Sequence, residues 1–176
     1  EQAEGRVLAR LDRPEARNVI DWATVEELHA LCAELEAEPK VLLLAGADGI
    51  FAAGADIAEL RERRRLDALQ GINSSVFERI SRLPMPSIAL IDGYALGGGA
   101  ELAYACDFRL GSTRARVGNP EPGLGILAAA GAAWRLKELV GEPVAKEILL
   151  AGRTLGADEA LEIHLLSEVT APEDLE

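Results

Sequence analysis

Two glutamates lie in glycine- and proline-rich surroundings where a carboxylate could move protons. Glu101 follows three consecutive glycines and is flanked by apolar residues, while Glu121 lies between two prolines that stiffen its backbone. A partly desolvated carboxylate has a tunable pKa and suits acid–base chemistry. Each residue also has a structural interpretation. Glu101 could merely favour a helix dipole, and Glu121 could lie in an exposed turn, so the two residues alone leave the function open.

Two glycine- and alanine-rich segments could supply free backbone N–H groups. The glycines at 97–99 lead into a predicted helix over 100–106, whose N-terminus would favour developing negative charge. The segment 51–57 follows a predicted strand, and its small residues would let a ligand approach the backbone closely. Neither segment is a phosphate-binding fingerprint. Alone, the first also fits a crowded packing contact and the second a tight turn with Asp56 as a helix cap.

Short apolar runs alternate with helical patterns, and these elements must position the candidate residues. Buried strands are predicted over 7–11, 41–45, 87–91 and 108–110. Helices are predicted over 22–37, across a charged region from 57 to 82, and over 100–106, 132–140, 143–151 and 158–164. Asp21 is a plausible cap for the first helix, and Gly141 and Gly152 are well placed to end two later ones. This alternation predicts an α/β fold with helices packed on a largely parallel sheet.

The composition excludes several classes of function. The chain has 176 residues, of which 49% are hydrophobic, so a single globular core is expected. A net charge of −12 argues against binding to nucleic acid or to an anionic membrane surface. Two cysteines cannot build a disulfide scaffold or a four-ligand zinc site, and the histidines show no metal-binding spacing. A cytoplasmic location is the default expectation.

Taken together, the segments resemble the enoyl-CoA hydratase/isomerase (crotonase) superfamily, and enoyl-CoA hydratase most closely. The motifs stand in the family's order: Phe51-Ala-Ala-Gly-Ala-Asp-Ile57, then Ala95-Leu-Gly-Gly-Gly-Ala-Glu101, then Asn119-Pro-Glu-Pro-Gly-Leu-Gly125. The resemblance implies a crotonase-like (ClpP/crotonase) β/α superhelix of repeated ββα units. Residues 1–176 would form one core domain, without the C-terminal helical and trimerisation region that family members usually have.

The resemblance also implies a reaction and a set of site residues. By family position, the N–H groups of Ala55 and Gly98 would form an oxyanion hole for a thioester enolate. Glu101 would orient and activate the water that adds to a 2-trans-enoyl-CoA, and Glu121 would deliver a proton to the α-carbon. The residues expected to contact the substrate are Ala53, Asp56, Ile57, Ala58 and Gly97, with Asp56 acting mainly in local positioning. No metal or cofactor is required, since coenzyme A is part of the substrate.

Several alternatives stay open. A Δ3-Δ2-enoyl-CoA isomerase would need only one proton-transferring glutamate, and a non-catalytic acyl-CoA-binding protein would keep the fold without turnover. A ClpP-like protease is set aside, because neither histidine lies in a suitable motif. The charged run 61–65 could meet the phosphates of coenzyme A or simply form a solvated helix face. By resemblance the partners would be an acyl-CoA substrate and, if the C-terminal helices exist in the full protein, further copies of the chain in a homotrimer or hexamer.

Overall fold

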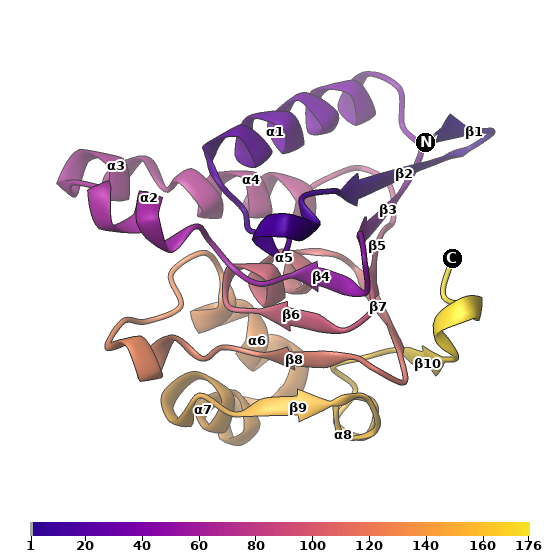
Figure 1. The fold of residues 1–176 in the computed structure, drawn as a ribbon. Helices are drawn as coiled ribbons and strands as arrows, with labels where there is room; N and C mark the ends of the chain where they lie inside the picture. The colour runs from indigo at the N-terminus through magenta and orange to yellow at the C-terminus, as the bar shows by residue number, and fades with distance from the viewer. Residues whose placement is uncertain (1) are drawn as a thin grey trace.

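A computed structural model describes residues 2–176, which form two sheets flanked by helices (Figure 1). The first sheet has the order β1-β2-β3-β5-β7-β10 and is parallel except for the β1–β2 pair. Its strands are β1 (Gln2–Ala3), β2 (Arg6–Leu11), β3 (Val41–Gly46), β5 (Ser87–Ile91), β7 (Phe108–Ser112) and β10 (Glu168–Thr170). The second sheet has the order β4-β6-β8-β9, with only the β8–β9 pair antiparallel. Its strands are β4 (Ile50–Ala52), β6 (Tyr94–Leu96), β8 (Arg116–Gly118) and β9 (Thr154–Gly156).

The chain winds as a superhelix in which each turn gives one strand to each sheet. The pairs β3/β4, β5/β6 and β7/β8 follow one another directly, and a helical segment closes each turn. The α-helices are α1 (Trp22–Ala37), α2 (Ile57–Glu62), α3 (Arg65–Gln70), α4 (Ile72–Ser81), α5 (Gly98–Ala105), α6 (Ala132–Val140), α7 (Glu142–Ala151) and α8 (Ala157–Glu162). Short 3-10 helices are η1 (Pro14–Ala16), η2 (Glu121–Leu124) and η3 (Pro172–Asp174). This arrangement confirms the expected fold of repeated ββα units.

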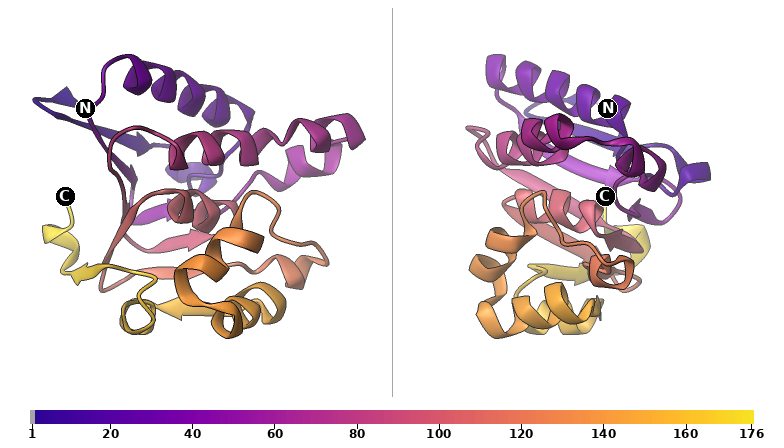
Figure 2. Two further views of the ribbon diagram at one scale, coloured as in Figure 1. Left: turned by 180° about the vertical axis from the view of Figure 1, so that it is seen from behind. Right: turned by 90° about the vertical axis from the view of Figure 1, so that its left-hand side faces the viewer.

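The helices stack along one side of the sheets. In order, α1 contacts α4, α4 contacts α5, α5 contacts α6, and α6 contacts α7, as seen from behind in Figure 2. The first helix runs over the predicted residues, and its expected cap is present, since the Thr24 N–H donates to Asp21 at 2.9 Å. Its buried positions recur at helical spacing, so the apolar periodicity of the sequence is the cause of this packing.

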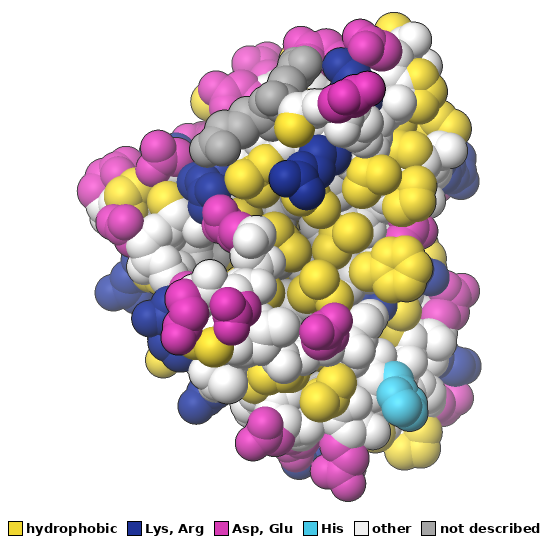
Figure 3. Space-filling view, turned by 90° about the vertical axis from the view of Figure 1, so that its right-hand side faces the viewer, with side chains coloured by type: hydrophobic (Ala, Val, Ile, Leu, Met, Phe, Trp, Pro, Cys, Tyr) yellow, Lys and Arg dark blue, Asp and Glu magenta, His cyan; other side chains and the backbone are white. Residues whose placement is uncertain are grey.

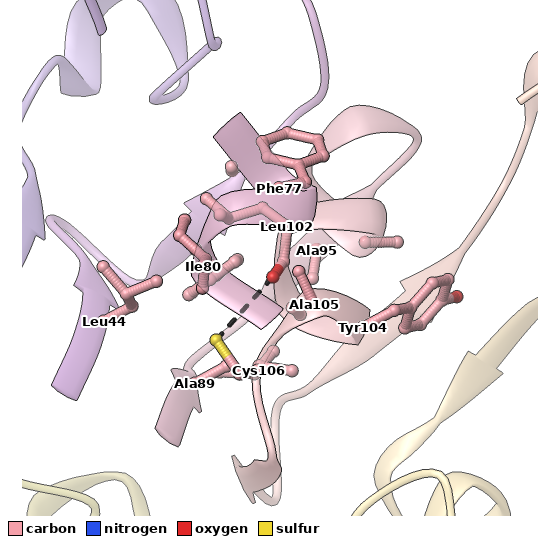
Figure 4. Close-up of a cluster of buried hydrophobic side chains, with 14 of the residues drawn as sticks. Leu44, Phe77, Ile80, Ala89, Ala95, Leu102, Tyr104, Ala105 and Cys106 are labelled. Atoms are coloured by element: carbon pink, nitrogen blue, oxygen red, sulfur yellow. Dashed lines mark hydrogen bonds between the residues drawn. The ribbon is translucent and has the colours of Figure 1, made fainter. Parts of the chain in front are cut away.

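Helix α5 runs through the middle of the core, and every one of its residues is buried. Figure 4 shows Leu102, Tyr104 and Ala105 among side chains from α4 and from strands of both sheets. Cys106, which follows the helix, donates from Sγ to the Leu102 carbonyl oxygen at 3.7 Å. Burial raises the pKa of this thiol to about 12, which confirms the prediction of a packed cysteine rather than a nucleophile. An ionisable side chain on this helix is therefore held in a low-dielectric environment.

The outer face of the first sheet carries a second, smaller apolar cluster. Figure 3 shows hydrophobic side chains gathered on this face. The buried members of the cluster are Ala45, Leu90 and Leu175, with Leu8, Leu43, Ile88 and Leu110 packed against them. Phe108 on β7 is 49% exposed. Within residues 2–176, no helix is long and apolar enough to cross a membrane.

The structure corrects three of the expectations from sequence. The predicted, largely parallel sheet is present, but short strands of three residues build a second sheet that the apolar runs did not indicate. The predicted helical region 57–82 is divided into α2, α3 and α4, where Arg63 and Arg64 adopt extended backbone and Gly71 adopts a left-handed conformation. Helix α5 also starts two residues earlier than expected, within the glycine triplet. Helix α6 matches its predicted range, and residues 126–131 before it are not helical.

Candidate active site

Two backbone segments meet at the start of α5, and glycine makes their close approach possible. A β-carbon placed on Gly98 would lie 3.2 Å from the nitrogen of Ala55. A β-carbon on Gly99 would collide with the carbonyl oxygen of Ala52 at the end of β4. Side chains at these positions would push the two segments apart. The glycine triplet therefore has the packing role considered above, and it also brings the backbone nitrogens of the two segments close together.

The N–H groups of Ala55 and Gly98 are placed to act together. Ile20 forms a parallel bridge with Ala55 by bonding to the residues on either side of it: the Ile20 N–H donates to Gly54 and the Asp56 N–H donates to Ile20. In such a bridge the N–H of the central residue points away from its partner, and Gly98 lies close to the Ala55 nitrogen. The Gly98 N–H opens α5 and has no carbonyl partner within its own helix. The arrangement suits two donors that share one acceptor.

Glu101 is a buried carboxylate in the first turn of α5. It is 5% exposed, and its Oε1 accepts the backbone N–H groups of Ala130 and Ala132 at 2.7 and 3.0 Å. These donors belong to the irregular segment that precedes α6 and to its first residue. Burial raises the pKa of Glu101 to about 7, against the lowering effect of the two hydrogen bonds and with a smaller contribution from the charge of Glu121. A carboxylate with this pKa can exchange protons near neutral pH.

Glu121 is also buried, which corrects the alternative of an exposed turn. The residue begins η2, and its Oε1 accepts the side-chain N–H of Asn119 at 3.3 Å. Asn119 in turn accepts the hydroxyl of Tyr104 at 3.1 Å. The other oxygen of Glu121, Oε2, is buried without a hydrogen-bond partner among the described residues. One oxygen is thus held in place while the second is available to a ligand.

A cavity of about 510 Å³ joins these groups. Both carboxylates line it, together with Ala55 and Gly98, which carry the two N–H groups. Its apolar wall includes Ile57, Leu60, Ile72, Leu124, Ile126 and Leu127. A second cavity of about 150 Å³ also reaches Glu101 and is lined in part by Trp134, which is half exposed. The larger cavity therefore holds two possible proton carriers and two possible N–H donors beside an apolar wall.

The residues expected to contact the substrate fall into two groups. Ala53, Ile57 and Gly97 line the cavity. Asp56 caps α2 by accepting the N–H groups of Ala58 and Glu59 at 2.8 and 3.1 Å, and the side chain of Ala58 is exposed outside the cavity lining. The local positioning role of Asp56 is thus what its contacts support. Among residues 2–176, no cluster of histidine, cysteine and carboxylate side chains could hold a metal ion.

Sequence reasoning missed three residues that shape the site and gave a fourth, Arg63, another role within the charged run 61–65. Tyr104 lies one turn after Glu101 on α5 and Asn119 begins the third motif, but no periodicity or spacing connects them to Glu121. Arg63 and Asn73 line the cavity from the region predicted as one continuous helix. Gly71 was the available signal, because glycine commonly ends a helix in the left-handed conformation seen here.

Comparison with known proteins links this geometry to a family. A family model described as enoyl-CoA hydratase/isomerase matches residues 1–176. The chain is 40% identical to a short-chain-enoyl-CoA hydratase of Clostridium acetobutylicum, over 99% of this chain and 69% of that protein. It is 37% identical to a crotonyl-CoA hydratase of Syntrophomonas wolfei, with the same two coverages. The crystal structure of an enoyl-CoA hydratase from Bacillus anthracis superposes with a TM-score of 0.92 at 35% identity, over 97% of this chain and 68% of that one.

Proposed function

The chain belongs to the enoyl-CoA hydratase/isomerase family, and we propose that it is an enoyl-CoA hydratase, a hydro-lyase acting on 2-trans-enoyl-CoA. Water is added reversibly across the conjugated double bond to give a 3-hydroxyacyl-CoA. The observation that carries this assignment is the pairing of two buried carboxylates, Glu101 and Glu121, in one cavity with two converging backbone segments. Relatives named as hydratases, matched over nearly the whole chain, support the same reaction.

In the proposed mechanism the thioester oxygen accepts the N–H groups of Ala55 and Gly98. Negative charge develops on this oxygen as water adds to the third carbon, and preorganised donors lower the energy of that state. One such donor is worth about 3 kcal/mol. The apolar wall strengthens these hydrogen bonds because it lowers the local dielectric constant. The contact between Gly98 and the Ala55 nitrogen supports this role for the pair.

The two glutamates divide the proton transfers. Glu101, with a raised pKa, orients the water and takes up a proton as the water oxygen bonds to the third carbon. Glu121 gives a proton to the second carbon, and its unpaired Oε2 is the atom available for this step. The pair carries the same number of protons before and after the reaction. Only protons and an oxygen lone pair move, so the proposed chemistry calls for no metal or redox cofactor.

The experiment that tests this proposal uses crotonyl-CoA in oxygen-18-labelled water. A hydratase gives 3-hydroxybutyryl-CoA with the label on the third carbon. Isomerase activity, the second candidate, is measured with a 3-enoyl-CoA, which would become a 2-enoyl-CoA without taking up label. It is favoured by the single unpaired oxygen of Glu121, which could suffice to move a double bond. Thioester binding without either product would indicate a non-catalytic protein and overturn the assignment.

The assembly is proposed from the resemblance, and the location from the composition of the chain. We expect an acyl-CoA thioester as substrate, a cytoplasmic location and, if the full protein has the C-terminal helices, a homotrimer or hexamer. Light scattering coupled to size-exclusion chromatography measures the assembly directly. A monomer at micromolar concentration would overturn the expected assembly while leaving the proposed reaction in place.

A further inference from the structure

A polar pair lies in the wall of the cavity that holds the two glutamates. Arg63 follows α2, and Asn73 lies in the first turn of α4. The guanidinium Nη1 of Arg63 donates to Oδ1 of Asn73 at 3.0 Å. Asn73 is 7% exposed, and both residues line the cavity beside Leu60 and Ile72. Arg64, Arg65, Asp67 and Ser74 also line this part of the cavity, so its wall here is partly polar.

Two donors of the pair are buried and have no partner. Neither Nη2 of Arg63 nor Nδ2 of Asn73 has a hydrogen-bond partner among the described residues, although both atoms are shielded from solvent. Buried polar groups in native proteins are almost always paired, because an unpaired donor loses its bonds to water without replacement. The only other buried side-chain atom of this kind in residues 2–176 is Oε2 of Glu121, the atom proposed above to act on substrate. By analogy with Oε2 of Glu121, we infer that the two unpaired donors of Arg63 and Asn73 are available to a ligand.

We propose that Arg63 and Asn73 form a subsite that selects acyl groups ending in a carboxylate. This inference rests on the proposed function and names the substrate class of the same site. A carboxylate offers two acceptor oxygens, which match a planar guanidinium and a neighbouring amide donor. The apolar neighbours strengthen such a charge-assisted bond. The nearby Asp67 does not neutralise the arginine through a direct contact, since its carboxylate accepts the backbone N–H of Arg64 at 2.7 Å.

The test measures binding of saturated thioesters by calorimetry, so that no turnover is needed. Succinyl-, glutaryl- and adipyl-CoA are compared with butanoyl-, pentanoyl- and hexanoyl-CoA of the same carbon numbers. We expect at least one acid to bind about tenfold more tightly than its apolar match, as for a hydrogen bond to a charged group. Arg63→Met should abolish that preference, and Asn73→Leu should reduce it. Arg61→Met removes one positive charge from an exposed position on α2 and should leave the preference intact.

Several results would overturn the inference. Equal affinities of the wild-type chain for the two series would do so without any variant, so a folding defect cannot mask the outcome. An equal loss of both series in Arg63→Met would assign the arginine to the coenzyme A part of the ligand. Failure of the proposed function has a different signature. The acid preference would then persist in binding while crotonyl-CoA is not hydrated, whereas hydration without any acid preference would remove this inference alone.

Discussion

The carboxylate of Glu121 lies directly against the α-carbon of Gly97, so that a β-carbon on Gly97 would lie 3.2 Å from Oε1. Gly97 also has a φ of +53°, a backbone conformation that residues with a β-carbon rarely adopt. Its carbonyl oxygen accepts the N–H of Glu101 at 2.9 Å. Gly97 therefore contacts both glutamates. The motif requires glycine at this residue because a β-carbon would crowd the Glu121 carboxylate and because φ is positive.

Gly97→Ala should therefore affect both stability and activity. The strained backbone should cost about 1–3 kcal/mol of unfolding free energy, measured by urea titration. Displacement of the Glu121 carboxylate should lower kcat for hydration of crotonyl-CoA by roughly tenfold or more. Gly123→Ala is the matched control, because a β-carbon there meets nothing within 4 Å. Wild-type kcat in Gly97→Ala would contradict the positioning of Glu121 described here.

The raised pKa of Glu101 predicts an unusual dependence of stability on pH. The folded pKa of about 7 lies above the ordinary value of 4.5, so the folded chain binds more protons than the unfolded chain between these values. Stability is then fully present below the lower pKa and is lost as the pH rises through the folded pKa. Glu101→Gln keeps an acceptor for the two N–H groups without the buried charge. It should raise the unfolding free energy by roughly 1–3 kcal/mol at about pH 8 and change it little at about pH 5.

Urea titrations at the two pH values measure this difference. Glu26→Gln, on the exposed face of α1, is the control and should shift the unfolding free energy by less than about 0.5 kcal/mol at both. If Glu101→Gln is less stable than wild type at the higher pH, the hydrogen bonds to the ionised Glu101 outweigh the cost of burying its charge. That result would contradict the raised pKa.

The hydratase activity should rise as the pH rises and Glu101 ionises, whereas the stability falls over the same range. If Glu101 accepts a proton from water, it must be ionised, and protonation removes it from the reaction. The value of kcat/KM should fall about tenfold for each pH unit below the pKa of about 7. A stopped-flow pH profile of crotonyl-CoA hydration measures this limb. A flat profile between about pH 5 and pH 8 would contradict the base role of Glu101.

The side chains behind Glu121 should act on the reaction through its position. Asn119→Ala removes the donor to Glu121 and leaves the buried Tyr104 hydroxyl unpaired, which should cost about 1–3 kcal/mol of stability. It should lower kcat more than it changes KM. Tyr104→Phe keeps the bond to Glu121 and should lower kcat less. A wild-type kcat in Asn119→Ala, together with a loss of stability, would indicate that Asn119 contributes only to stability.

The elements that sequence reasoning predicted best are those with long apolar patterns. Helix α1 matches its predicted range, and Val41–Gly46 and Ser87–Ile91 are strands as expected. The strands of the second sheet have three residues each, too few to show a period of two. Their pairing depends on contacts between segments distant in the chain, such as β8 with β9. No local pattern carries that information.

The site could be predicted in part for a related reason. The glycines and glutamates have distinctive types and order, so the motifs alone place Glu101 and Glu121 in one family pattern. The partners of Glu101 are the backbone N–H groups of Ala130 and Ala132, which any residue except proline could supply. The positions of the unpaired donors of Arg63 and Asn73 likewise depend on where α2, α3 and α4 begin and end. Burial and unpaired atoms, which only the fold defines, made these contacts visible.

The most direct measurement of the central claim is the loss of conjugated enoyl-thioester absorbance when crotonyl-CoA is added to the wild-type chain, Glu101→Gln, Glu121→Gln and the double variant. The two carboxylates are proposed to act on one water and one α-carbon as a unit. Each single variant should lower kcat by about 10² to 10⁴, and the double variant should be scarcely slower than the slower single one. Turnover near the wild-type rate in either single variant would contradict the account.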